Sequence, residues 1–168
     1  MQPSSVPMNI QWLFYTIKDE ESVITLLRDK GLLHRERVCP SCNEAMQLGR
    51  GGQVWRCYKR SCRTEVSIRT GTWFEGTRGR LKLRKAVQFM DFWSCSYSTV
   101  KMCKDELGTD KNVTCRWNRY MREVAAEALG KIALPLHLCE SMWRKRLAPT
   151  DNAFEKMFQD IANLHPPQ

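Results

Sequence analysis

Four cysteines in two closely spaced pairs are the residues of this sequence best suited to chemistry. Cys39 and Cys42 enclose a proline and a serine, and Cys57 and Cys62 follow after a spacer of fourteen residues. A zinc ion binds four thiolates at the corners of a tetrahedron, and two tight turns can each supply two of them. Binding of the ion then helps to fold a segment that has few apolar residues. The spacing predicts a zinc ribbon that holds one structural Zn²⁺ ion.

Other uses of these cysteines fit the sequence less well. Disulfide bonds need an oxidising compartment, and the N-terminus lacks the charged start and long apolar stretch of a signal peptide. A redox Cys-x-x-Cys motif is expected beside a βαβ pattern, which does not surround Cys39. Four unrelated buried cysteines are a further alternative. His34 lies close to Cys39 in the sequence, but with four cysteines present we expect a surface histidine rather than a ligand.

The positive charge of the chain is concentrated next to these cysteines. The 168 residues carry a net charge of +9, and the stretch from Arg50 to Lys85 contains eleven basic and two acidic residues. A focused positive field attracts polyanions, although many basic stretches are only solvated surface. We interpret this stretch as a nucleic-acid surface. The expected phosphate contacts are Arg56, Lys59, Arg60, Arg63, Arg78, Arg80, Lys82, Arg84 and Lys85.

Hydrophobic periodicity predicts an α+β fold, a small zinc-ribbon β-sheet followed by a three-helix bundle. Strands are expected over 53–56 and 64–69, where Val66 and Ile68 alternate with polar residues. Residues 132–138 contain Pro135 and are not expected to form a regular long helix. The expected helices span residues 19–30, 81–95, 98–107, 111–129 and 152–164.

These elements divide the chain into four expected parts. Residues 1–34 form an N-terminal tail and a short helix, and residues 35–80 form the zinc ribbon. Residues 81–130 form the helical bundle, and residues 131–168 are a C-terminal extension of unknown role. Hydrophobic residues make up 42% of the chain, which is enough for a core, and no apolar run is long enough to span a bilayer. We expect a soluble protein without a membrane partner.

The helices expected over 98–107 and 111–129 are joined by a turn that contains glycine, as in a helix-turn-helix motif. In that motif the second helix enters the major groove, where asparagine and arginine make paired contacts with adenine and guanine. Here the second helix has one apolar and one polar face, although plain helical bundles show the same pattern. The expected base-reading residues are Asn112, Asn118, Arg119 and Arg122.

Several short motifs occur in an order that resembles a known family. They include Gly31-Leu-Leu-His34, the two cysteine pairs, Ile68-Arg-Thr-Gly71-Thr-Trp73, Leu83-Arg-Lys85 and Trp117-Asn-Arg-Tyr120-Met-Arg122-Glu123. Over residues 13–129 this order resembles the N-terminal region of Merlin-type DDE transposases, eukaryotic relatives of bacterial insertion-sequence transposases. The resemblance implies a zinc ribbon and a helix-turn-helix that bind transposon ends in double-stranded DNA.

The catalytic part of that family is not expected in this chain. The family continues into an RNase H-like domain with three acidic metal ligands, which begins with a strand bearing Asp-Glu-Ser. This chain has Cys139-Glu140-Ser141 at the similar place, and 29 residues follow Cys139. Two-metal phosphoryl transfer needs carboxylates on a rigid platform, which Glu140, Asp151, Glu155 and Asp160 lack. We expect no catalytic residues and no transposase activity.

The resulting expectation is a non-catalytic DNA-binding protein derived from a transposase, and its nuclear location is inferred from DNA binding. A second copy of the chain or an intact transposase is an additional candidate partner. One alternative is a zinc-ribbon protein-interaction module, in which the ribbon is a rigid docking surface and the apolar segment around Phe154 to Ile161 dimerises or holds a partner. Another is a single-stranded nucleic-acid binder that uses Trp55 or Tyr58, because aromatic and basic side chains together stack unpaired bases.

Overall fold

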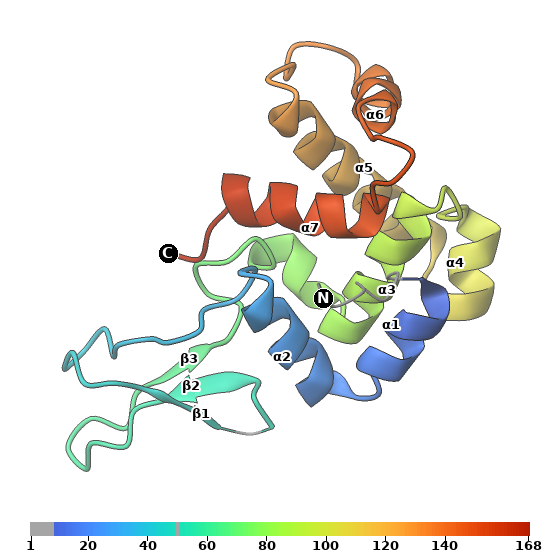
Figure 1. The fold of residues 1–168 in the computed structure, drawn as a ribbon. Coiled ribbons are helices and arrows are strands. Elements are labelled where there is room, and N and C mark those ends of the chain that lie inside the picture. Colours follow the sequence, from blue (N-terminus) through green and yellow to red (C-terminus); the bar gives the residue numbers. More distant parts are fainter. Residues whose placement is uncertain (1–8, 50) are drawn as a thin grey trace, which may run out of the picture.

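A computed structural model describes residues 9–49 and 51–168 of the chain. Residues 1–8 of the expected tail and Arg50 of the basic stretch lie outside the described residues. The described part is α+β, as predicted, with seven α-helices and a three-stranded antiparallel sheet. Figure 1 shows the helices gathered in one body, from which the sheet and its loops extend as an arm. We call residues 38–67 the β-arm and the described helices together the helical body.

The block of strands lies between two groups of helices in the sequence. In chain order the elements are α1 (Ile10–Thr16), α2 (Glu20–Asp29), β1 (Gln47–Gly49), β2 (Val54–Arg56), β3 (Glu65–Ser67), the 3₁₀-helix η1 (Gly76–Arg80), α3 (Leu83–Ser94), α4 (Val100–Leu107), α5 (Lys111–Ala128), α6 (Leu136–Lys145) and α7 (Ala153–Leu164). None of the described helices is both long and apolar enough to cross a bilayer.

The sheet of the β-arm has β2 as its central strand. β1 and β3 pair with it in antiparallel fashion, which places Leu48 and Val66 on either side of Trp55. Side chains that are opposite each other across a sheet share one face. Trp55 is buried there with Met46 and the cysteines, and this small hydrophobic cluster is separate from that of the helical body. Both predicted strands are confirmed, each shorter than expected.

The larger hydrophobic core joins the helices to the segment that follows the sheet. Ile68, Trp73 and Phe74 are buried in it, together with residues from α1, α2 and α3 to α7. Trp73 contacts Trp117 of α5 edge-on, with ring centroids 5.9 Å apart. The limit expected between residues 80 and 81 therefore does not coincide with the limit between the two cores.

The base of the β-arm is held by hydrogen bonds between segments far apart in the sequence. The carbonyl oxygen of Thr70 accepts a hydrogen bond from Arg37 Nη1 at 2.6 Å and lies 3.3 Å from His34 Nε2. The backbone N–H of Gln168 donates to the carbonyl of Gly71 at 2.9 Å. Gly71 has φ of +74°, and a Cβ at this position would collide with the backbone of Gln168.

Helix α3 lies at the centre of the helical body. Apolar residues occur around most of its circumference, and it packs against α2, α4, α5 and α7. Such a wide apolar surface is typical of a helix that is buried on several sides. Its first backbone N–H groups are capped from another helix, because the Glu20 carboxylate of α2 accepts from Leu83 N at 2.9 Å. The predicted central helix is confirmed.

The predicted helix pair is confirmed as α4 and α5, with one correction. Ser98 was expected to cap α4, but the side chain of Thr99 accepts from Met102 N instead. Gly108 ends α4 in the left-handed conformation, with φ of +63°. Asp110 then caps α5 by accepting a hydrogen bond from Val113 N at 2.9 Å.

Four of the described elements were not predicted, namely α1, β1, η1 and α6. Helix α6 begins directly after Pro135, which stands at its N-cap, where a missing backbone N–H costs no helical hydrogen bond. The expectation of no regular helix near this proline was therefore wrong for the residues after it. The seven residues of α1 contain a continuous apolar and aromatic run, which gives no helical period to recognise.

The predicted C-terminal helix is confirmed as α7, but its apolar face is covered by the chain itself. Phe154, Met157, Phe158 and Ile161 are at most 2% exposed and belong to the core of the helical body. Helix α7 packs against α3 and α5. We therefore correct the expectation that this segment offers a docking surface to a partner.

Asp91, in the middle of α3, carries a pH dependence that stability measurements can detect. It is 3% exposed, and burial raises the pKa of its carboxyl from 3.8 to about 6. The folded state binds this proton more tightly than the unfolded state does, so the free energy of unfolding falls as pH rises from about 4 to 6. Replacement by the uncharged, similarly shaped asparagine removes this effect.

We expect Asp91→Asn to be more stable than the parent protein at pH 7 by about 1–3 kcal/mol, and by much less at pH 4.5. Melting temperatures of both proteins across this range give the measurement. The comparison of variant with parent at each pH cancels the contributions of all other titrating groups. A stability difference that stays constant between pH 4.5 and 7 would contradict the assignment.

Candidate metal centre and nucleic-acid interface

The four predicted ligands come together at the far end of the β-arm. The Sγ atoms of Cys39, Cys42, Cys57 and Cys62 all lie within 4.8 Å of one another. The pairs Cys39–Cys62 and Cys42–Cys57 are each 3.5 Å apart. Thiolates around a tetrahedral zinc ion at 2.3 Å are about 3.8 Å apart, so the cluster fits one such ion. All eight cysteines of the chain are free thiols, and these four can hold a metal ion.

Each cysteine pair is presented by a tight turn of the backbone. In the first turn Asn43 N donates to the carbonyl of Cys39 at 2.9 Å, and Asn43 has φ of +57°. In the second turn Arg63 N donates to the carbonyl of Lys59 at 3.2 Å, and Arg63 has φ of +53°. Asparagine tolerates this left-handed conformation, whereas for arginine it costs about 1 kcal/mol.

The thiols of the cluster differ in acidity. Burial raises the pKa of Cys39, but hydrogen bonds from Ser41 N–H and Cys42 N–H outweigh it and lower that pKa to about 6. A hydrogen bond from Glu44 N–H acts to lower the pKa of Cys42, yet burial and the other thiols raise it to about 12. A metal ion binds thiolates, so its binding must displace the proton of Cys42 and is favoured by higher pH.

His34 lies outside the cluster, in agreement with the prediction that it is not a ligand. Its Nε2 is 3.3 Å from the carbonyl oxygen of Thr70 at the base of the β-arm. Burial and the neighbouring charge of Arg37 both lower the pKa of the His34 imidazole. The residue therefore contributes to the position of the arm relative to the helical body.

The described basic residues of the β-arm, Arg56, Lys59, Arg60 and Arg63, lie on its surface, and two of them are paired with acids. Arg56 Nε donates to Glu65 at 2.8 Å, and Lys59 Nζ is 3.7 Å from Glu44. Arg60 and Arg63 are exposed. Together with Tyr58 they line a hollow of about 480 Å³.

The basic residues predicted to contact phosphate between the arm and the first turn of α3 fall into two groups. Arg78 is half-buried, donates to the carbonyl of Trp73 at 2.5 Å, and lies over the rings of Trp73 and Tyr120. Arg84 donates to the carbonyl of Ile17 at 3.1 Å. These contacts disfavour a phosphate role for both residues. The side chains of Arg80 and Lys82 are exposed, and that of Lys85 is half-buried.

Two of the four expected base-reading residues are held by contacts with residues outside α5, whereas Arg119 Nε donates to Glu123 within the same helix at 2.8 Å. Asn118 Nδ2 donates to the carbonyls of Ser98 and Thr114 at 3.0 and 3.1 Å, and its Oδ1 accepts from Ser98 Oγ at 2.7 Å. Arg122 Nε donates to Glu140 of α6 at 2.6 Å. Both side chains connect α5 to its neighbours, which disfavours a base-reading role for them.

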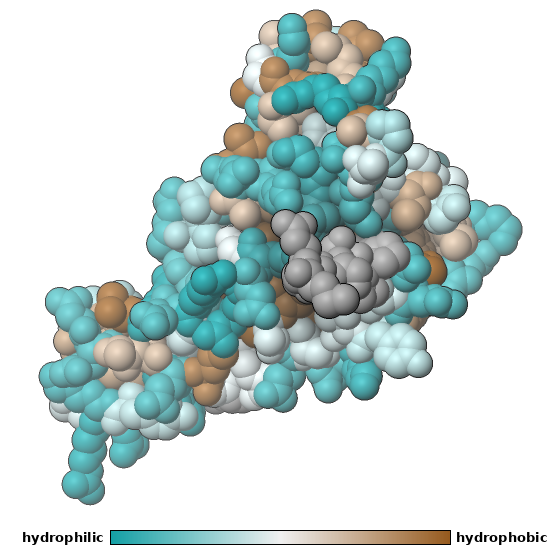
Figure 2. Space-filling view, viewed as in Figure 1, coloured by the Kyte–Doolittle hydropathy of each residue, from teal (hydrophilic) through white to brown (hydrophobic). Residues whose placement is uncertain are grey.

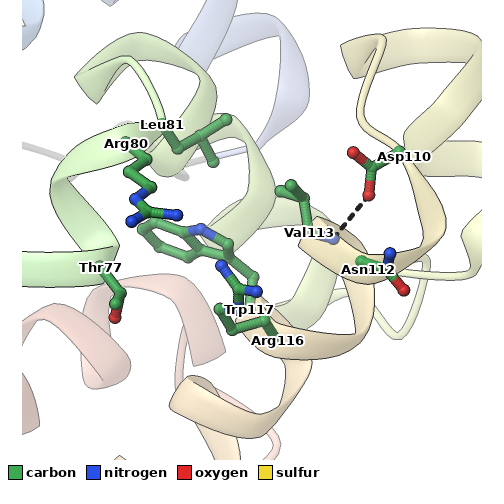
Figure 3. A pocket seen from close by; sticks show the side chains of 8 residues that line it. All are labelled: Thr77, Arg80, Leu81, Asp110, Asn112, Val113, Arg116 and Trp117. Carbon is green, nitrogen blue, oxygen red and sulfur yellow. Dashed lines mark hydrogen bonds between the residues drawn. The ribbon is translucent and has the colours of Figure 1, made fainter.

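The exposed side chains of α5 form a stripe nearer its N-terminus. Asn112 and Arg119 are exposed there, and so is Arg116, which the sequence analysis did not select. Its position four residues after Asn112, on the same side of a helix, was the available signal. Figure 3 shows Arg80, Asn112 and Arg116 around a pocket of about 310 Å³, with the Trp117 ring between the two guanidinium groups in this view.

The metal centre predicts a defined stoichiometry. We expect the purified protein to bind one zinc ion per chain and Cys57→Ser to lose nearly all of it, because serine is a poor zinc ligand. Elemental analysis of the dialysed proteins measures the zinc content. Cys95→Ser is the matched control, since Cys95 is exposed and lies outside the cluster. Full zinc content in Cys57→Ser would contradict the assignment.

The contacts of Asn118 predict that its replacement lowers the stability of the protein rather than its recognition of a DNA sequence. Asn118→Ala removes two hydrogen bonds between α5 and Ser98 and a third to Thr114 within the helix, and we expect a lower free energy of unfolding by about 1–2 kcal/mol. Asn112→Ala is the control, because exposed polar residues change stability by about 0.5 kcal/mol or less. Urea unfolding of the zinc-loaded variants, followed by tryptophan fluorescence, gives the comparison. Equal stabilities would argue against this role of Asn118.

Comparison with known proteins finds no matching family model, no matching curated protein and no matching solved structure. The resemblance to Merlin-type transposases therefore depends on the sequence motifs and stays a prediction.

Proposed function

We propose that this chain is a non-catalytic DNA-binding protein in which α4, the turn at Gly108 and α5 act as a helix-turn-helix. The exposed stripe of Asn112, Arg116 and Arg119 is the observation that carries the proposal. These side chains are of the types that read base edges in the major groove, which is wide enough for one helix. In this proposal α5 enters the groove with its N-terminal half, where the pocket beside Arg80 also lies.

The phosphate contacts of the proposal are the exposed cations next to this stripe. Arg80 and Lys82 precede α3 and lie outside the network of internal contacts that holds Arg78 and Arg84. Cations of this kind fix the protein on the duplex without reading its sequence. The β-arm, with a zinc ion in the cysteine cluster as a zinc ribbon, adds Lys59, Arg60 and Arg63. Two further parts of the sequence-based expectation belong to this proposal. They are descent from a Merlin-type transposase and residence in the nucleus.

The contacts of the acidic residues support the non-catalytic part of the proposal. Glu140 bonds to both Arg122 and Arg144, at 2.6 and 2.9 Å. Glu155 pairs with Lys30, the residue after α2, at 2.7 Å, and Asp160 accepts from the Trp143 indole at 2.7 Å. Carboxylates that hold catalytic metal ions must face one another, whereas these three are engaged in separate structural contacts.

Selection of bound duplexes from a random pool, with zinc-loaded protein at two salt concentrations, tests the proposal. We expect an enriched motif, and affinity that falls steeply with salt because phosphate contacts release counterions. Arg116→Ala should weaken binding to that motif by about 1–3 kcal/mol and relax the preference at one base pair. Lys145→Ala removes an exposed cation from α6 and is the control for charge alone.

Each other outcome has a defined meaning. Salt-dependent binding without a motif would leave a general nucleic-acid binder and reject base reading by α5. Duplex binding that is absent even at low salt would reject the proposal and favour a protein-interaction role of the zinc ribbon. A motif that survives Arg116→Ala and Asn112→Ala but not Asn118→Ala would contradict base reading by the exposed stripe. It would instead support base reading by Asn118, as expected from the sequence alone.

A further inference from the structure

Tyr58 is an exposed aromatic residue beside the cysteine cluster, far from α5 in the sequence. Its side chain lies in the hollow of about 480 Å³ that is also lined by Arg56, Arg60 and Arg63. The residue is 59% exposed, whereas Trp55, the other aromatic residue expected to stack bases, is 3% exposed. The flat face of an aromatic ring among cations is a recurring platform for unpaired bases.

The backbone before Tyr58 and the Tyr58 ring each have a supporting contact. It follows Cys57, whose sulfur belongs to the cluster and whose backbone N–H donates to Thr64 O at 2.9 Å. It also lies beside the Arg56 guanidinium, which Glu65 holds at 2.8 Å. A ring that is fixed before its ligand arrives loses little conformational entropy on binding.

Two of the described cations around the ring are not paired with an acid, unlike Arg56. Among residues 9–49 and 51–168, neither Arg60 nor Arg63 has an ion-pair partner shown in the structure. Arg63 also occupies the left-handed conformation, with φ of +53°, at the place where the first turn has Asn43. Glycine or asparagine adopts this conformation with less strain than arginine does. The arginine at this position therefore adds a positive charge to the hollow but also strains the backbone.

We propose that the hollow around Tyr58 binds an unpaired nucleotide of a single-stranded nucleic acid, with the base stacked on Tyr58 and the phosphate held by Arg60 and Arg63. This site is separate from the duplex-reading face of α5 and does not require it. A paired base inside a duplex cannot stack on a protein ring, so an exposed tyrosine adds nothing to duplex binding. The surrounding arginines select a polyanion over a neutral aromatic ligand.

The test compares two ligands, a labelled oligothymidylate and a blunt duplex, with zinc-loaded full-length protein in fluorescence anisotropy. We expect Tyr58→Ala to weaken single-strand binding by about 5- to 150-fold and to leave duplex binding unchanged. Tyr58→Phe keeps the ring and should retain most of the affinity. Tyr97→Ala is the matched control, because Tyr97 is 56% exposed but lies between α3 and α4. Zinc content confirms that each variant keeps the cluster.

Arg63→Gly gives a second test, because it should weaken single-strand binding without lowering the stability of the protein. It relieves the left-handed strain, so its midpoint of urea unfolding should be equal to or higher than that of the parent. Its affinity for the oligothymidylate should fall, and the slope of log affinity against log salt should decrease by about 0.7. A lower stability together with lower affinity would mean that Arg63 is structural.

The outcomes separate this site from the proposed duplex reading. Unchanged single-strand affinity in zinc-loaded Tyr58→Ala overturns the site, whatever the duplex result. Equal losses for both ligands also overturn it, because Tyr58 would then contribute without the stacking that only an unpaired base allows. Single-strand binding that depends on Tyr58, in a protein that fails to bind the blunt duplex, supports this site while it rejects the proposed function.

Discussion

Burial of α3 on several sides is the constraint on which the rest of the helical body depends. The helix contacts α2, α4, α5 and α7, so the positions of these four helices relative to one another are set by the side chains of one segment. Phe89 meets Trp117 of α5 with ring centroids 5.8 Å apart, and Trp93 meets Trp143 of α6 at 5.4 Å. Close-packed interiors tolerate little change in volume, so packing of the apolar side of α5 fixes the rotation of the helix about its axis. That rotation determines the direction in which the polar stripe on the opposite side faces.

The β-arm is stabilised by a different kind of interaction. Its buried cluster contains Met46, Trp55 and two of the cysteines, with few other apolar side chains around them. A core of this size contributes little free energy, and small domains of this kind commonly depend on metal ions. The two surfaces of the molecule therefore differ in what preserves them. The position of α5 follows from apolar burial, whereas the surroundings of Tyr58 follow from the cluster of four cysteines that can hold a metal ion.

Strong local patterns made several features predictable from the sequence. The cysteine spacing identified the cluster, and the long apolar period of α5 located that helix to within one residue at its C-terminal end. Periodicity also placed Asn118 and Arg122 on the polar face, yet it does not reveal what covers that face. Asn118 is bound by the Ser98 segment, twenty residues earlier, and Arg122 by Glu140 of a helix that was not predicted. Such partners come from tertiary packing, which no local pattern of α5 encodes.

The hydrogen bonds at the base of the β-arm have a consequence for any nucleic acid that touches both surfaces. Arg37 and His34 on one segment meet Thr70 on the other, and Gln168 is bound to the adjoining turn. These contacts restrict pivoting of the arm, so the separation between Tyr58 and Arg116 is set by the protein. One extra base pair shifts a point on DNA by about 3.4 Å along the axis and rotates it by about 35°. If one nucleic acid occupies both proposed surfaces, a rigid base fixes the number of nucleotides between the double-stranded segment at α5 and the unpaired base at Tyr58.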